Sequence, residues 1–394
     1  MSALSHTIAY RSRFIGLIAS ALLSMQVIAS DGEQPKQLQQ IVNAAVTPVM
    51  QQYQIPGMAV AITYQGQASY FNFGVASLAQ QTPVTSDTIF ELGSVSKTFN
   101  ALLAGYAIDQ GKIELTAHPS HYWPALKGSA IDNATMLQLA TYSAGGLPLQ
   151  FPDSVKDNAD MLHYFQQWQP TTTMGEQRQY SNPSIALFGY LASRALGDDF
   201  SNLITNQLLP AFGLHHTYVE VPAAAQQQYA WGYNQQLQPV HVNPAVLDAE
   251  AYGIKSTATD MLRYVQLQLD PSTLAVAYQH AIATTQVGYY QLGKMQQGLG
   301  WEQYPHPVAE SVLLEGNSSE MILQSRAVKP VASRITGARL FNKTSSTGGF
   351  GAYVVFVPEH QLGIVLLANR FYPNTARVEI ATQIMAWFDQ AIDQ

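Results

Sequence analysis

The two ends of the chain carry matching pairs of strand-like runs, and no other feature constrains the fold as strongly. Near the N-terminus, residues 58–64 and 68–73 flank a short Gln-Gly-Gln turn, which predicts a β-hairpin. Near the C-terminus, residues 352–357 and 362–368 flank Pro-Glu-His-Gln and predict a second hairpin. Two hairpins from opposite ends of one chain predict one antiparallel sheet built from both ends.

Helices accompany both hairpins. Apolar residues between 38 and 53 recur with the helical period and stop before Pro56, and a last helix is expected from about Thr375 onwards. The middle of the chain reads as helices joined by loops that contain Pro and Gly. We therefore expect an α+β fold, with an antiparallel sheet flanked by helices and a mostly helical inserted region.

The same pattern predicts how the chain is divided. We expect residues 31–93 and 293–394 to form the sheet region, and residues 94–292 to form the mostly helical region. Residues 222–253 show little periodicity. A long irregular loop inside a compact domain is usually functional, so we expect this loop to line a cleft.

Residues 1–30 have the features of a signal peptide. Arg11 and Arg13 precede a mostly apolar stretch. It ends in Ala29 and Ser30, whose small side chains suit a cleavage site. The stretch is short and interrupted for a membrane span, and a short buried helix is the alternative. We expect export to the periplasm and no stable membrane insertion.

Composition excludes several classes of function. The chain has no cysteine, which excludes disulfides, zinc–thiolate sites, iron–sulfur clusters and cysteine nucleophiles. The formal net charge is −7, and loss of the two arginines in the signal peptide moves it to −9. Phosphate contacts need a basic face, so we expect no nucleic-acid partner.

Ser94 and Lys97 form a Ser-x-x-Lys motif at the start of a predicted helix that stops near Gly111. Residues three apart share one helix face. The free N–H groups and positive dipole end of a helix N-terminus favour a serine alkoxide and an oxyanion. Burial would lower the pKa of the lysine, which could then share the serine proton. The plainer alternative is that Ser94 is only a helix N-cap.

Two further motifs carry groups suited to the same chemistry. Tyr180 stands in Tyr-Ser-Asn, and a tyrosine between two cations can lose its proton near neutral pH. The amide of Asn182 can donate to a substrate carbonyl and accept from Lys97. Lys343, in Lys-Thr-Ser, is expected at a sheet edge, where it can pair with an anionic substrate. A turn or a solvated lysine explains each motif alone, but the combination favours a catalytic site.

In order and spacing the three motifs resemble those of the penicillin-recognising serine hydrolases. Longer segments resemble class C, cephalosporinase-type serine β-lactamases, and the likeness runs from about residue 36 to the C-terminus. It is carried by residues 91–97, 139–150, 178–184, 247–253 and 369–377. The resemblance implies the serine β-lactamase fold and hydrolysis of the β-lactam amide of cephalosporins and penicillins, which gives antibiotic resistance.

The resemblance also implies catalytic roles. Ser94 is implied as the nucleophile that forms the acyl-enzyme. Lys97 and Tyr180 are implied to manage its proton, and Tyr180 to help activate the deacylating water. Lys343 and Thr344 are implied to bind near the substrate carboxylate and to order Tyr180.

The remaining implied residues contact the substrate. The N–H groups of Ser94 and Ser346 would form the oxyanion hole. Gln150 and Asn182 would contact the acylamino side chain. Asn374 would lie near the carboxylate, and Tyr252 would form a wall of the cleft. The family implies no metal, no cofactor and a monomer that takes small β-lactam substrates.

Two positions depart from the family pattern. Ser345 stands where the family usually has glycine, and its side chain could narrow the site or shift the strand. We expect it to alter substrate range or rate without abolishing activity. Phe371 replaces a polar residue, and we assign it no role.

The same fold and the same residue types also occur in proteins with other functions. A DD-peptidase or esterase of the same fold shares the nucleophile, and a non-catalytic β-lactam sensor needs acylation without fast hydrolysis. Two histidine pairs, His118 with His121 and His215 with His216, lack a nearby carboxylate pair or a shared direction, so we expect no metal there.

Overall fold

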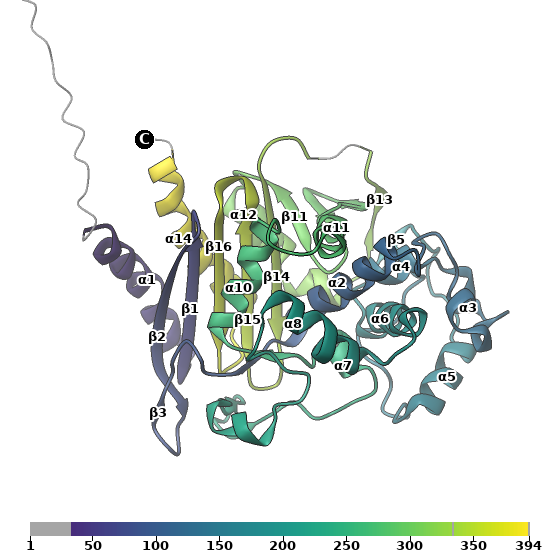
Figure 1. Cartoon of the computed structure of the whole chain (residues 1–394), viewed down its shortest axis with the longest axis horizontal. Coiled ribbons are helices and arrows are strands. Elements are labelled where there is room, and N and C mark those ends of the chain that lie inside the picture. Colours follow the sequence, from purple (N-terminus) through teal and green to yellow (C-terminus); the bar gives the residue numbers. More distant parts are fainter. Residues whose placement is uncertain (1–32, 333–334, 393–394) are drawn as a thin grey trace, which may run out of the picture. The chain divides into compact units, whose positions relative to one another are not determined.

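The computed structural model of the protein describes residues 33–332 and 335–392 (Figure 1). The described residues from Gln39 onwards belong to the larger of two compact units, and all of the contacts described here lie within it. The predicted signal peptide, residues 1–30, lies outside the described residues. Among the helices that the structure describes, none has the length and apolar character needed to cross a membrane.

A ten-stranded antiparallel sheet is the framework of the larger unit. Its strand order is β13-β9-β10-β11-β14-β15-β16-β1-β2-β3. β1, from the N-terminal part, pairs with β16, from the C-terminal part, so the predicted sheet built from both chain ends is confirmed. The strands are β1 (Gly57–Tyr64), β2 (Gln67–Ser77), β3 (Thr82–Pro83), β9 (Tyr290–Leu292), β10 (Met295–Gln297), β11 (Glu302–Pro305), β13 (Lys329–Pro330), β14 (Arg339–Ser346), β15 (Gly351–Val357) and β16 (Leu362–Ala368).

Both predicted hairpins form. β1 and β2 pair over their length and turn at residues 65–66, where both residues have positive φ. β15 and β16 pair in register on either side of the short helix η6 (Pro358–His360). Strands β9, β10 and β11 were not predicted, because they are short and rich in glutamine and lack apolar alternation.

Helices cover both faces of the sheet. On one face, α10 (Ala258–Leu269) packs against β1 and β16, and Gln266 Nε2 donates to Thr63 Oγ1 at 3.2 Å. On the other face lies α14 (Asn374–Ile392), and the centroid of its Phe388 ring is 4.8 Å from the centroid of the Tyr64 ring. Successive side chains point to opposite faces of a strand, so Thr63 and Tyr64 identify the two faces. Because both faces are covered, β1 and β16 are apolar runs that are almost entirely buried.

The buried helix α2 (Ser96–Asp109) joins the sheet to the helical part of the chain. Its Asn100 Nδ2 donates to the carbonyl oxygens of Ile185 at 2.8 Å and Glu250 at 2.9 Å. These bonds connect α2 to α6 (Asn182–Leu196) and α9 (Asp248–Ala251). The other α-helices are α1 (Glu33–Gln52), α3 (Pro119–Tyr122), α4 (Met136–Ala140), α5 (Asn158–Gln167), α7 (Phe200–Leu203), α8 (Leu209–Phe212), α11 (Val276–Thr285), α12 (Glu310–Gly316) and α13 (Ser319–Leu323).

The irregular segment 222–253 contains only short elements. It holds the 3-10 helix η5 (Ala223–Gln228), a two-residue pair of strands, and α9. The two-residue strands outside the large sheet are β4 (Phe90–Glu91), β5 (Gln177–Arg178), β6 (Gly232–Tyr233), β7 (Pro239–Val240), β8 (Lys255–Ser256) and β12 (Arg326–Ala327). The end of this segment lies beside Lys97, which donates a hydrogen bond to the carbonyl oxygen of Ala251.

Candidate active site

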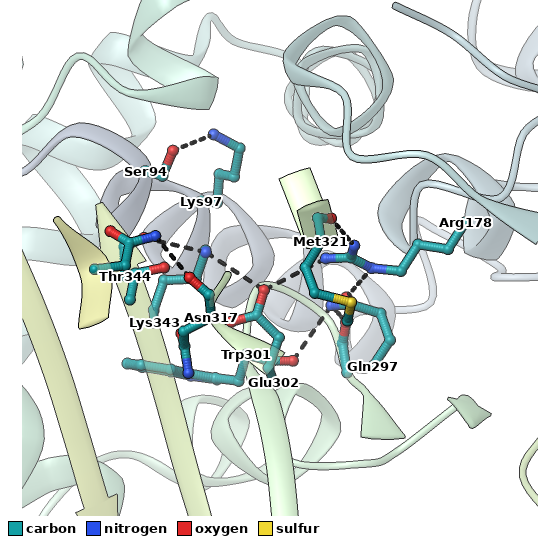
Figure 2. Close-up of polar contacts among 12 residues, drawn as sticks. Ser94, Lys97, Arg178, Gln297, Trp301, Glu302, Asn317, Met321, Lys343 and Thr344 are labelled. Atoms are coloured by element: carbon teal, nitrogen blue, oxygen red, sulfur yellow. Dashed lines mark hydrogen bonds and ion pairs between the residues drawn. The ribbon is translucent and has the colours of Figure 1, made fainter. Parts of the chain in front are cut away.

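Ser94 lies in a single 3-10 turn, η1 (Gly93–Val95), that leads into α2. Its side chain is partly exposed, whereas its neighbours from Val95 to Asn100 are buried. Lys97 Nζ donates to Ser94 Oγ at 2.9 Å (Figure 2). It also donates to the carbonyl oxygen of Ala251 at 2.7 Å. The N-cap of α2 is Val95, so Ser94 does not act as its N-cap. The geometry therefore favours a reactive serine over the plainer alternative.

Lys97 is completely buried, and this sets its protonation. Burial lowers the pKa of the Lys97 ammonium, and the nearby charge of Lys343 lowers it further, while Tyr180 acts in the opposite direction. The net pKa lies below the ordinary value for lysine. A lysine in this state can accept and return the proton of the hydroxyl to which it is bonded.

Tyr180 lies between two cations. Lys97 Nζ is 5.1 Å and Lys343 Nζ is 5.2 Å from the centroid of its ring. Burial raises the pKa of the Tyr180 phenol, but the charges of Lys343 and Lys97 and a hydrogen bond with Ser94 outweigh burial, and the net pKa is lowered. A phenolate beside a serine hydroxyl is a candidate general base.

A buried ion cluster supports Lys343 from behind. Glu302 Oε1 lies 3.4 Å from Lys343 Nζ and 3.5 Å from Arg178 Nη2 (Figure 2). Arg178 also donates to Gln297 Oε1 at 2.8 Å and to the carbonyl of Met321 at 2.9 Å. Two cations and one carboxylate leave a net positive charge near Tyr180, which favours its ionised form.

Sequence reasoning missed this cluster. Glu302 stands in the short strand β11, which lacks the alternation that would have marked it as buried. Arg178 stands two residues before Tyr180, in a segment that resembles the family but for which the resemblance implied no role at position 178. The available signal was that Glu302 and Arg178 are charged residues among apolar and amide neighbours.

Ser345 contacts the loop that precedes the nucleophile. Its hydroxyl donates to the carbonyl oxygen of Leu92, and the side chain is buried. Gly93 has a φ of +49°, and a Cβ built there would lie 2.4 Å from Ser345 Oγ. The Ser345 side chain therefore occupies space against the 92–93 backbone, and glycine at 93 permits both that approach and the positive φ.

Arg377, on α14, forms hydrogen bonds with the last two residues of β14. Its guanidinium is fully buried and donates to the carbonyl oxygens of Ser345 and Tyr372, and to Ser346 Oγ at 2.9 Å. Burial lowers the pKa of Arg377 to about 10. One carbonyl and one hydroxyl on β14, together with the carbonyl of Tyr372, thus replace an acidic partner, and the bonds to β14 hold residues 345–346 in place.

The other predicted site residues come from several elements. Asn182 begins α6, and its backbone N–H donates to the carbonyl of Leu149, the neighbour of Gln150, at 3.0 Å. Tyr252 follows Ala251, the residue that accepts from Lys97. Asn374 begins α14 and donates through Nδ2 to the carbonyl of Asn317 at 3.0 Å.

Two details concern predicted contacts. Asn182 Oδ1 is buried and receives no hydrogen bond from any residue that the structure describes, so the expected bond from Lys97 is not formed. Lys97 is instead bonded to Ser94 and Ala251. Thr344 is buried on β14, and its carbonyl accepts from Lys343 Nζ at 3.1 Å.

Known proteins resemble this chain in sequence and in fold. The β-lactamase family model matches residues 42–386 of the chain. The chain belongs to the β-lactamase family. A β-lactamase of Pseudomonas fluorescens is 48% identical over 357 residues, which are 90% of this chain and 99% of that protein. A β-lactamase of Escherichia coli (strain K12) is 47% identical, over 89% of this chain and 94% of its own.

A solved structure is similar as well. The β-lactamase/D-alanine carboxypeptidase from Pseudomonas syringae superposes with a TM-score of 0.86 at 42% identity, covering 89% of this chain and 99% of its own. The β-lactamase family consists of serine hydrolases that open the β-lactam amide, so the predicted family, fold and enzyme class are confirmed.

Proposed function

We propose that this β-lactamase is a periplasmic, monomeric class C enzyme that hydrolyses cephalosporins and penicillins through an acyl-enzyme on Ser94. The observation that carries the proposal is the 2.9 Å hydrogen bond from a buried Lys97 to Ser94 Oγ, beside a tyrosine of lowered pKa. The number of cationic and phenolic groups around one partly exposed hydroxyl exceeds what a structural serine needs.

Acylation begins with removal of the Ser94 proton. Lys97 or the Tyr180 phenolate accepts it as Oγ attacks the lactam carbonyl carbon. The new C–O bond forms, the carbonyl oxygen becomes an oxyanion, and the C–N bond then breaks as the nitrogen takes up that proton from the group that accepted it. The N–H groups of Ser94 and Ser346 are the proposed oxyanion donors, since Ser94 lies in the turn that leads into α2 and Ser346 is the last residue of β14.

Deacylation repeats the proton transfers with water. Tyr180, returned to its phenolate form, accepts a proton from the water that attacks the ester carbon. The C–O bond to Ser94 breaks, Oγ recovers a proton, and the ring-opened acid leaves. Lys97 and Lys343 stabilise the phenolate in both steps, which is why their positions 5.1 and 5.2 Å from the ring centroid matter.

Substrate recognition is proposed for the residues around this centre. The unpaired Oδ1 of Asn182 and the nearby Gln150 are suited to the acylamino side chain of the substrate. Asn374, Thr344 and Lys343 are proposed to hold the carboxylate. Tyr252 is proposed as a wall of the cleft.

A division of the chain follows from the same assignment. We propose that the substrate binds where the sheet region, residues 31–93 and 293–394, meets the mostly helical region, residues 94–292. Ser94 stands at this junction, and the loop 222–253 would line the cleft. Near the end of that loop, the carbonyl oxygen of Ala251 accepts a hydrogen bond from Lys97 Nζ at 2.7 Å. This contact supports a position for the end of the loop beside the nucleophile.

The test is hydrolysis of a chromogenic cephalosporin by the purified protein beside the Ser94→Ala variant. We expect turnover in the parent and its loss by several orders of magnitude in the variant. The control variant is Ser193→Ala, which removes a helix serine whose hydroxyl is bonded within α6. Turnover that survives in Ser94→Ala would remove Ser94 as the nucleophile.

A second function on the same site is a D-alanine carboxypeptidase. It is favoured by the name of the similar Pseudomonas syringae protein, which combines both activities. Release of D-alanine from a peptide that ends in D-alanyl-D-alanine measures it. Fast release with stable acylation by cephalosporins would make the peptidase the main function, whereas fast cephalosporin turnover with slow release supports the β-lactamase.

A further inference from the structure

Two histidines and an aspartate from three separate segments meet away from Ser94. His306 directly follows β11, His360 ends η6 between β15 and β16, and Asp389 lies near the end of α14. One nitrogen of each ring and one carboxylate oxygen all lie within 4.8 Å of one another. The topology of the sheet creates this cluster: β11 ends opposite Arg339, the first residue of β14, η6 also contacts β14, and α14 contacts β15.

The distances are too long for good hydrogen bonds. His306 Nε2 is 3.4 Å and His360 Nδ1 is 3.6 Å from Asp389 Oδ1, whereas N–H···O bonds centre near about 2.9–3.0 Å. Ligands about 2.0–2.1 Å from a tetrahedral zinc ion stand roughly 3.4 Å apart. The two histidine–aspartate distances are therefore close to the separation of ligands around a common ion, and the hydrogen bond between His306 Nε2 and Asp389 is a long one.

The two rings carry nitrogens that lack partners. His306 Nδ1 and His360 Nδ1 are buried and form no hydrogen bond with any residue in the described part of the chain. His360 Nδ1 is also the atom that faces Asp389. A buried polar atom without a hydrogen bond is costly, and a bound ion would satisfy the one that faces the carboxylate.

Access and local charge are compatible with an ion. The His306 side chain is 4% exposed, but those of His360 and Asp389 are 24% and 33% exposed, which gives a path from solvent. The nearby cation Arg339 is paired with Glu359 at 3.3 Å and is therefore partly neutralised. An ion there would carry two imidazoles and one carboxylate, with a fourth position open to water.

We propose that His306, His360 and Asp389 form a binding site for a divalent transition-metal ion of the zinc class. This site is separate from the Ser94 chemistry. Its ligands join the end of α14 to the end of β11 and to the turn between β15 and β16. Binding would therefore stabilise the C-terminal helix on the sheet.

The experiment uses the full protein, stripped with a chelator and titrated calorimetrically with zinc chloride. We expect one equivalent to bind tightly, and His360→Ala to weaken that event by at least about a hundredfold, because even partners outside the ligand shell change affinity about 10–100-fold. Zinc at about a hundred times its Kd should raise the Tm of the parent by about 4 °C and leave that of His360→Ala unchanged.

The matched control is His280→Ala. His280 Nδ1 pairs with Asp109 Oδ1 at 2.7 Å, a normal hydrogen bond between one histidine and one aspartate. This variant should bind zinc like the parent. Asp389→Asn, which keeps the side-chain volume, should behave like His360→Ala. Equal zinc binding in the parent, His360→Ala and Asp389→Asn would overturn the proposal, as would a loss of binding that His280→Ala shares.

Discussion

Replacing Glu302 with glutamine removes a carboxylate that lies against both Lys343 and Arg178. The side chains of all three are at most 7% exposed, so solvent cannot take over the lost charge. Glutamine keeps the volume and one acceptor oxygen, and the change therefore isolates the charge. Two effects are expected, one on the free energy of unfolding and one on the pKa of Tyr180.

The stability effect follows from the burial. Removing one partner of a buried ion pair typically destabilises a protein by about 3–5 kcal/mol. We expect the lower end, about 3 kcal/mol, because glutamine still accepts a hydrogen bond. With an unfolding entropy of about 2.1 cal/mol/K for each of roughly 360 folded residues, the Tm should fall by about 4 °C.

The electrostatic effect favours activity at low pH, whereas the loss of the ion pair lowers stability. The charge of Glu302 raises the pKa of Tyr180, so its removal lowers that pKa further. If the Tyr180 phenolate is the base, the acid limb of the kcat/KM profile moves to lower pH. Glu302→Gln should therefore be less stable than the parent and yet keep its activity at lower pH.

Thermal unfolding and a pH–rate profile with a cephalosporin test both effects. Glu359→Gln in metal-free buffer is the control, because the Arg339–Glu359 pair is about one-third exposed and such pairs contribute about 0–1 kcal/mol. An acid limb that moves to higher pH would refute the electrostatic reasoning. An unchanged Tm would show that the cluster does not stabilise the fold.

Three further changes probe other parts of the site and core. Tyr180→Phe should lower kcat by about 10²–10⁴-fold and abolish the acid limb, as a pH–rate profile would record. Ser345→Gly loses the bond to Leu92, so we expect about 1 kcal/mol less stability and an altered kcat for cephalosporins and penicillins; unchanged kinetics would contradict a role for this side chain. Burial raises the pKa of Glu250 from 4.5 to about 8. The unfolded chain then ionises first, and stability should fall as pH rises from 4.5 towards 8; denaturant titrations of Glu250→Gln should show a flatter dependence.

Local patterns in the sequence predicted the candidate nucleophile and the outline of the fold. Ser94 and Lys97 were predictable together because three residues on a helix place two side chains on one face. The hairpins at both ends were equally readable from their apolar runs. Tyr180 and Lys343 were suggested by motif, and the structure brings both within reach of Lys97.

Groups that act through long-range contacts were not predictable. Nothing near Glu302 in the sequence indicates Arg178 or Lys343 as its partners, and the carbonyl ligands of Arg377 are set by backbone positions. The same holds for the cluster of His306, His360 and Asp389, whose members come from three separate segments. The histidine pairs that attract attention in the sequence are neighbours along the chain, whereas this cluster exists only after the sheet has formed.

The pairing of β1 with β16 also dictates when the molecule can be completed. Met58 lies opposite Ala368, so hydrogen-bonded partners are separated by about 300 residues along the chain. At about 5–20 residues per second, a ribosome needs roughly 15–60 s to make the second partner after the first. During that interval the β1–β2 hairpin presents an unpaired edge, a surface that invites association with other chains. A chain truncated before residue 362 would retain that edge permanently. Pairing of β16 with β1 therefore removes this exposed edge of the N-terminal hairpin and, with it, a route to aggregation.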